Sequence, residues 1–241
     1  MNSKGILDTQ YALDRERKPE LIFRYKTRAQ FVANCAHRYL GGHMGLSILD
    51  FGAAEGLTIR ELDVLMPGGR ITGVEFSQEL IDKAVPLPQN VSLVKGDVTQ
   101  LDTELKESKY DVVSALALLE HLPNPLDAVK EASAVLAPGG LFIASSPNPF
   151  WDDVSTKLGL LRDEQHEVEM TETFMTTLVA DAGLELIRFE RFMWSPVAFL
   201  PYLKIRVNPS LSLSVDRAVS KLRIFDWLYV NQAIIARKPS V

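Results

Sequence analysis

The sequence predicts an α/β fold, a mostly parallel sheet with helices on both faces. Short apolar segments alternate with segments of helical periodicity from residue 46 onward. The first apolar segment leads into a glycine-containing turn and then into a helix. The 241 residues are enough for one large α/β domain with a substantial core. Strands that alternate with helices are typical of parallel sheets, because parallel neighbours need a crossover connection.

Seven apolar segments predict strands in chain order. They cover residues 46–50, 70–75, 91–94, 110–115, 141–145, 184–192 and 232–237. Helical spacing predicts the helices between them, over 55–66, 78–85, 125–136 and 171–182. Pro86, Pro138 and Gly183 follow three of these helices, where a helix-breaking residue is expected.

The two ends of the chain differ from this alternation. Residues 1–45 have helical spacing and are expected to form an N-terminal helical cap before an α/β domain at 46–241. Residues 194–230 contain several prolines and aromatic residues, followed by apolar residues at helical spacing. This segment predicts a helical insertion between the sixth and seventh strands.

Charge and cysteine content narrow the function classes. The net charge of −5 divides into +4 over residues 1–40, −15 over 41–185 and +6 over 186–241. An acidic body argues against a protein that binds nucleic acid with its whole surface. Cys35 is the single cysteine, and the sequence has no apolar stretch of 18 residues and no signal-peptide pattern. We therefore expect a cytoplasmic protein without disulfides.

The most informative motif runs from Ile48 to Gly56. Gly52 and Gly56 allow close approach of a ligand to the backbone, and the helix that follows presents its N-terminal N–H groups. Glu75 ends the next strand, where a carboxylate can accept hydrogen bonds from both hydroxyls of a ribose. Asp97 follows the third strand and can accept one from an adenine amino group. The motif predicts an adenosine pocket at the carboxyl ends of three strands.

The spacing of the glycines in this turn argues against a domain that binds a nicotinamide dinucleotide. A nicotinamide-binding domain would carry Gly-x-Gly-x-x-Gly after the first strand. Here Ala54 occupies the position of the middle glycine, and the two glycines are four residues apart. The turn therefore lacks the opening that a pyrophosphate needs.

The chain resembles the class I S-adenosylmethionine-dependent methyltransferases, in particular the group that includes ubiquinone-biosynthesis O-methyltransferases. The matching stretches are Leu49–Gly56, Gly73–Ser77, Gly96–Val98, 110–114, Leu119–Leu122, Val135–Gly140, Ser146–Asn148 and Ala182–Leu184. The resemblance covers about residues 28–193 and the last strand. It implies a Rossmann-like seven-stranded methyltransferase sheet whose last strand is antiparallel, and S-adenosylmethionine as the cofactor.

The resemblance also implies roles for single residues. The methionine end of the cofactor would contact Asp50, Gly52, Ala53, Gly56, Ala115, Leu116 and Arg28. Glu75 would bind the ribose, Phe76 would lie along the adenine, and Asp97 with the backbone of Val98 would bind the adenine edge. No metal is expected, because the Glu-x-x-Glu-His pattern of quinone-type relatives is reduced here to Glu120 and His121.

The methyl acceptor is less well defined by the sequence. We expect transfer to an oxygen of a small or lipid-linked metabolite, with no nucleic acid favoured as a partner. His166 and His121 are the candidate catalytic bases, although a loop histidine and a helix-start histidine are the simpler interpretations. Residues 194–230 could form a lid, a membrane-surface contact, an interface or a plain structural cap. A methyltransferase acting on RNA or protein, and a non-catalytic binding protein, remain as alternatives.

Overall fold

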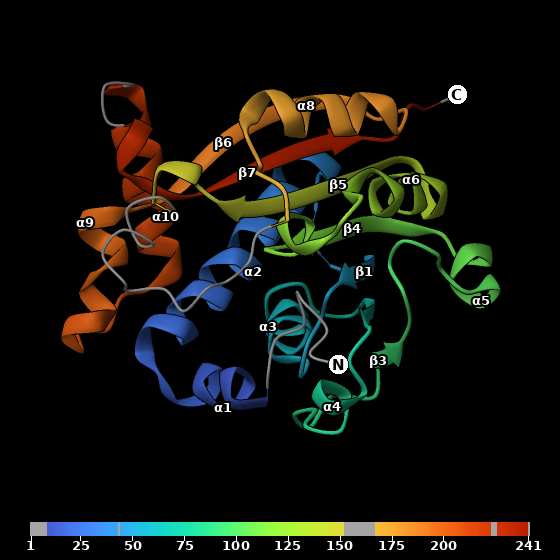
Figure 1. The fold of residues 1–241 in the computed structure, drawn as a ribbon, viewed down its shortest axis with the longest axis horizontal. Coiled ribbons are helices and arrows are strands. Elements are labelled where there is room, and N and C mark those ends of the chain that lie inside the picture. The colour runs from blue at the N-terminus through green and yellow to red at the C-terminus, as the bar shows by residue number, and fades with distance from the viewer. Residues whose placement is uncertain (1–8, 43, 152–166, 223–225, 241) are drawn as a thin grey trace.

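The computed structural model describes residues 9–42, 44–151, 167–222 and 226–240. Within them, seven strands form one sheet (Figure 1). They are β1 (Ser47–Phe51), β2 (Arg70–Glu75), β3 (Val91–Lys95), β4 (Tyr110–Leu116), β5 (Leu136–Pro147), β6 (Glu185–Trp194) and β7 (Tyr229–Arg237). All seven predicted strands are therefore confirmed, with ends that shift by up to five residues; the largest shift is in β5, which begins at Leu136 instead of 141.

The strand order is β3-β2-β1-β4-β5-β7-β6. Strands β1 to β5 pair in parallel, whereas β7 lies antiparallel between β5 and β6. This confirms the predicted α/β class and the antiparallel last strand. The carboxyl ends of the parallel strands therefore meet at one edge of the sheet, which is where α/β proteins bind ligands.

Alternating residues of the central strands pack on opposite faces. Ile48 contacts the cluster formed with α2 (Pro19–Leu40), α3 (Leu57–Leu65) and α10 (Pro209–Val219). Leu49 contacts the cluster on the other face, with α5 (Thr103–Glu107), α6 (Pro125–Val135) and α8 (Glu172–Asp181). Two helical layers therefore enclose a sheet that is apolar on both sides, as buried parallel strands require.

One predicted helix is wrong in length. The helix expected over 78–85 is α4 (Gln78–Ile81), and only turns follow it. The N–H of Val85 donates to the carbonyl of Glu55 at 2.9 Å, which holds this stretch of backbone against the glycine turn. This hydrogen bond takes the place of the one that the N–H of Val85 would form inside a helix. Local periodicity does not predict a contact between residues so far apart in the chain.

The N-terminal residues form α1 (Thr9–Arg17) and α2. Most of the buried apolar side chains of α2 belong to the same core cluster as β1 and β4, so α2 is one of the helices that cover the sheet. The predicted division of the chain into an N-terminal helical segment, residues 1–45, and an α/β domain, residues 46–241, remains a prediction.

Between β6 and β7 the chain forms α9 (Ser195–Ala198), η2 (Leu200–Leu203), α10, η3 (Ser220–Leu222) and η4 (Asp226–Leu228). We call this segment, residues 195–228, the cap. Figure 1 shows α9 and α10 together at one end of the sheet. Tyr202 accepts a hydrogen bond from Arg24 of α2 at 3.0 Å, so the cap contacts the N-terminal helices. None of the described helices is long and apolar enough to cross a membrane.

Candidate functional site

The turn after β1 depends on left-handed backbone conformations. Gly52 and Gly56 have φ values of 72° and 88°, and Ala54 between them has a φ of 49°. A Cβ at Gly52 would lie 2.8 Å from the side chain of Leu118. Glycine fits there because it tolerates positive φ and takes no side-chain space. Strain at the non-glycine Ala54 is a feature that clusters at ligand-binding loops.

Glu75 anchors this turn. Its Oε2 accepts a hydrogen bond from the N–H of Ala54 at 2.9 Å, and its Oε1 accepts one from the N–H of Ser77 at 2.8 Å. The side chain is buried, and its carboxylate is fixed at the carboxyl end of β2. Each carboxylate oxygen can accept more than one hydrogen bond, so two acceptor positions remain for a ligand.

Asp50 is buried at the end of β1, beside Ser114 of β4. The hydroxyl of Ser114 donates to Oδ1 of Asp50 at 2.6 Å. Burial raises the pKa of Asp50 to about 7, and the Ser114 hydrogen bond only partly opposes this rise. A buried carboxyl with a pKa near neutrality is typical of a ligand-binding or catalytic position.

A cavity of about 80 Å³ opens at this edge of the sheet. It brings together five residues singled out from the sequence, namely Arg28, Asp50, Gly52, Leu116 and His121. Arg28 reaches it from α2 and donates to Oδ1 of Asn231 at 3.0 Å. His121 comes from η1 (Leu119–His121), just beyond β4. The N-terminal helices therefore cover the carboxyl end of the sheet.

The other predicted cofactor residues lie outside this cavity. Ala53, Ala115, Val98 and Glu75 are buried, whereas Phe76 and Asp97 are exposed at the ends of β2 and β3. Gly56 precedes α3 as its N-cap residue. Asp97 accepts hydrogen bonds from the N–H and the hydroxyl of Thr99 through a single oxygen, Oδ1. Within the described residues its second oxygen accepts no hydrogen bond, and its contact with adenine remains a prediction.

His166 falls outside the described residues. The chain is described again from Glu167, whose N–H donates to the carbonyl of Glu120 at 2.9 Å. The residue after His166 is thus bound next to His121. No group of three or more His, Cys, Asp or Glu side chains in the described part of the chain could hold a metal ion. That the protein requires no metal remains a prediction.

Sequence reasoning missed an ion pair that connects α1 to the glycine turn. Arg15 lies 3.2 Å from Oε2 of Glu55 and donates to the hydroxyl of Thr58 at 3.0 Å. Both partners are almost fully buried, with side-chain exposures of 11% for Arg15 and 1% for Glu55. Arg15 also lines the cavity. No local pattern signals this pair, because its members are 40 residues apart.

A glycine turn between a strand and a helix, with a fixed carboxylate at the end of the next strand, defines a nucleoside-binding α/β protein. A family model described as a methyltransferase domain matches residues 10–188. The chain belongs to the class I S-adenosylmethionine-dependent methyltransferase family.

Two relatives illustrate the similarity. The ubiquinone biosynthesis O-methyltransferase of Alkalilimnicola ehrlichii is 32% identical over 124 residues, which cover 50% of this chain and 48% of that protein. The malonyl-[acyl-carrier protein] O-methyltransferase of Halalkalibacterium halodurans is 30% identical over 112 residues, or 44% and 41% of the two chains. The chain thus spans less than half the length of these relatives.

The fold extends over nearly the whole chain. The magnesium protoporphyrin IX methyltransferase of Synechocystis PCC 6803, solved with bound S-adenosylhomocysteine, superposes with a TM-score of 0.61. The match covers 98% of this chain and 90% of that one at 15% sequence identity. This likeness concerns the fold.

Proposed function

We propose that the protein transfers a methyl group from S-adenosylmethionine to an oxygen of a small or lipid-linked metabolite. The fixed Glu75 carboxylate beside the glycine turn is the observation that carries the cofactor part of this proposal. Two relatives named as O-methyltransferases support oxygen as the acceptor atom. A transfer assay that follows release of S-adenosylhomocysteine with catechol and with an aliphatic amine would test the preference. Transfer to the amine alone would contradict it.

The buried acids suit the chemistry of this cofactor. S-adenosylmethionine supplies a methyl group on a positively charged sulfur. Asp50 faces the cavity at the proposed methionine end, together with Gly52, Leu116 and Arg28. Ala53, Gly56 and Ala115 form the backbone around that end. Glu75 would accept both ribose hydroxyls, while Phe76, Asp97 and Val98 would surround the adenine.

The pKa of Asp50 predicts how cofactor affinity depends on pH. Burial raises this pKa to about 7 from 3.8, so the folded protein holds the proton more tightly than the unfolded chain. Ionising Asp50 therefore weakens the fold as the pH rises from about 4 to about 7, and a cation bound beside it offsets that loss. We expect affinity for S-adenosylmethionine to rise by up to about tenfold per pH unit below pH 7 and then to level off. Calorimetric titrations across this range measure it.

Two comparisons separate Asp50 from other titrating groups. In an Asp50→Asn variant the affinity should be weaker at high pH and nearly constant across the range. Adenosine lacks the methionine ammonium, so its affinity for the unchanged protein should not follow the pKa of Asp50. An equal pH dependence for both ligands would remove Asp50 from the methionine end.

Two histidines are proposed to handle the proton of the acceptor. Positioning dominates a displacement at the sulfonium carbon, and a base is needed only when a hydroxyl must lose its proton. We expect His166→Ala to lower turnover about 10²–10⁴-fold while cofactor affinity stays unchanged. His121→Ala tests the second candidate, because His121 lines the cavity. Full turnover in both variants would leave neither histidine a catalytic role.

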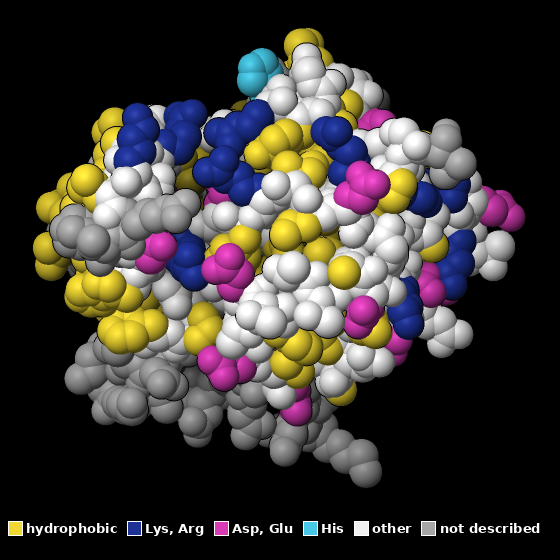
Figure 2. Space-filling model, turned by 90° about the horizontal axis from the view of Figure 1, so that it is seen from above, with side chains coloured by type: hydrophobic (Ala, Val, Ile, Leu, Met, Phe, Trp, Pro, Cys, Tyr) yellow, Lys and Arg dark blue, Asp and Glu magenta, His cyan; other side chains and the backbone are white. Residues whose placement is uncertain are grey.

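The cap exposes large apolar side chains together with basic ones. Leu203 and Leu211 are 72% and 62% exposed, and the exposed Lys204 and Arg206 follow Leu203 within three residues. Figure 2 shows hydrophobic side chains along the left edge of the molecule, where Figure 1 has α9 and α10. Apolar and basic residues on one exposed segment are typical of proteins that bind anionic membrane surfaces. Such contact would bring a lipid-linked acceptor to the site.

Vesicle flotation tests this contact. We expect the protein to float with vesicles that contain phosphatidylglycerol and less with phosphatidylcholine alone. Replacing Leu203 and Leu211 by Gln should reduce flotation several-fold. Each Å² of apolar surface that no longer enters the membrane lowers the binding free energy by about 25 cal/mol. Gln at Met44 and Val64, which are equally exposed, is the matched control. Equal losses in both double variants would contradict a specific role for the cap.

A further inference from the structure

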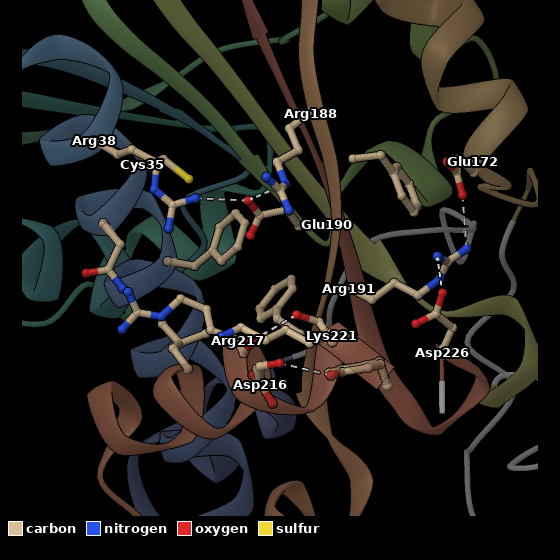
Figure 3. Close-up of a pocket in the computed structure, with 17 residues that line it drawn as sticks. Cys35, Arg38, Glu172, Arg188, Glu190, Arg191, Asp216, Arg217, Lys221 and Asp226 are labelled. Carbon is tan, nitrogen blue, oxygen red and sulfur yellow. Dashed lines mark hydrogen bonds and ion pairs between the residues drawn. The ribbon is translucent and has the colours of Figure 1, made fainter. Parts of the chain in front are cut away.

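A second, larger hollow lies along the edge strand of the sheet. It measures about 590 Å³ and lies between α2, the edge strand β6 and α10 (Figure 3). We call it the β6 groove. Its volume is in the range of small-molecule sites. The stacked rings of Phe31 and Phe192, with centroids 4.6 Å apart, form part of its lining.

Cations outnumber acids where α2 and β6 meet. Arg38 and Arg188 both bind the same oxygen of Glu190, at 3.1 Å and 3.0 Å. One carboxylate thus neutralises only one of two guanidinium groups. Figure 3 shows these three side chains together on one side of the groove. The surplus guanidinium charge is available to an anion, and guanidinium groups bind phosphate oxygens through paired hydrogen bonds.

The opposite side of the groove adds two further cations. Arg217 and Lys221 come from α10 and η3, and both are exposed. Arg217 donates to the hydroxyl of Ser214 at 3.1 Å. Within the part of the chain that the structure describes, neither side chain forms an ion pair with a carboxylate. Figure 2 shows Lys and Arg side chains gathered around a hollow on this face.

The remaining acids of the groove are already engaged. Arg191 pairs with Glu172 at 3.0 Å and with Asp226 at 3.5 Å, at one end of the groove. Asp216 accepts the N–H groups of Met193 and Trp194 at 2.8 Å and 2.9 Å, so its carboxylate is used within the protein. The lining as a whole carries five cations and four acids, and Arg191 neutralises only one of its two carboxylates. The excess of cations lies around Arg188, Arg217 and Lys221, away from the end with Glu172 and Asp226.

We propose that the β6 groove binds the phosphoryl group of a small organic phosphate ester. The surplus cations would bind the phosphoryl oxygens, and Phe189, a partly exposed aromatic side chain of the lining, would contact the organic part. The site is separate from the proposed cofactor site, since the two hollows share no lining residue. Helix α2 lines both, through Arg28 in one and Phe31 in the other.

Isothermal titration at low salt tests this proposal, with S-adenosylhomocysteine present at saturation to occupy the cofactor site. The probes are phenyl phosphate, inorganic pyrophosphate and phenol. We expect phenyl phosphate to bind more tightly than pyrophosphate, and phenol not to bind. An Arg217→Ala and Lys221→Ala double variant should bind phenyl phosphate at least about tenfold more weakly, the scale of charge-assisted hydrogen bonds.

The matched control removes two exposed cations elsewhere, with Lys83→Ala and Lys130→Ala. It should keep the affinity of the unchanged protein, and both double variants should keep their affinity for S-adenosylhomocysteine. If both double variants bind phenyl phosphate equally weakly, the loss follows from the lower net charge alone, and the proposal is overturned. Absence of phenyl phosphate binding would overturn it too, as would pyrophosphate binding as tight as that of the ester.

Discussion

A Glu75→Gln variant should bind S-adenosylmethionine about 1–3 kcal/mol more weakly than the unchanged protein, which corresponds to a factor of about 5 to 150. The amide oxygen can still accept one of the two N–H groups that hold the turn, those of Ala54 and Ser77. The amide nitrogen would face the other N–H and has no lone pair for a ribose hydroxyl. Both the turn and the sugar contact are therefore weakened. Calorimetric titration with the cofactor measures the effect.

Two controls make this result interpretable. Glu79→Gln removes an exposed carboxylate four residues away and should leave the affinity unchanged. Urea unfolding of the Glu75→Gln variant separates loss of the fold from loss of the site. A stable Glu75→Gln variant that binds the cofactor as tightly as the unchanged protein would remove Glu75 from the ribose contact.

Replacing Arg15 by Met should destabilise the protein by about 3–5 kcal/mol, because it leaves the buried Glu55 carboxylate without its cation. Burial already raises the pKa of Glu55, and Arg15 is the strongest group that lowers it. The loss should shrink as the pH falls, since protonation of Glu55 removes the unpaired charge. Urea unfolding at neutral and at mildly acidic pH measures both effects.

The double variant Arg15→Met with Glu55→Gln is the control. It removes both charges and should recover most of the lost stability, because uncharged partners no longer suffer the burial of an ion. Thr58 would still lose its hydrogen bond from Arg15, so recovery should be incomplete. A single variant that unfolds like the unchanged protein would show that α1 does not hold the glycine turn.

The fold followed from local signals in the sequence. Leu46–Asp50, the turn at Gly52 and the regular alternation of strands and helices predict a parallel sheet, because two-sided burial produces continuous apolar segments. The exception was the helix expected over 78–85. It ends early because Val85 is bound to Glu55, a contact set by tertiary structure.

The site was predictable where it follows strand ends. Asp50 is the last residue but one of β1 and Glu75 ends β2, so parallel pairing brings them to one edge. Arg15 and Ser114 escaped prediction because their partners are 40 and 64 residues away. The β6 groove escaped for the same reason, since its cations come from α2, β6 and the cap. Periodicity locates elements, but it does not report which side chains from distant elements meet.

A crystal structure with bound S-adenosylhomocysteine tests the central claim most directly. We expect both ribose hydroxyls within hydrogen-bond distance of the Glu75 carboxylate, and the methionine end in the cavity beside Asp50 and Arg28. The adenine should lie between Phe76 and Val98, within reach of Asp97. Density for the ligand in the β6 groove instead, or a ribose that does not contact Glu75, would contradict the account.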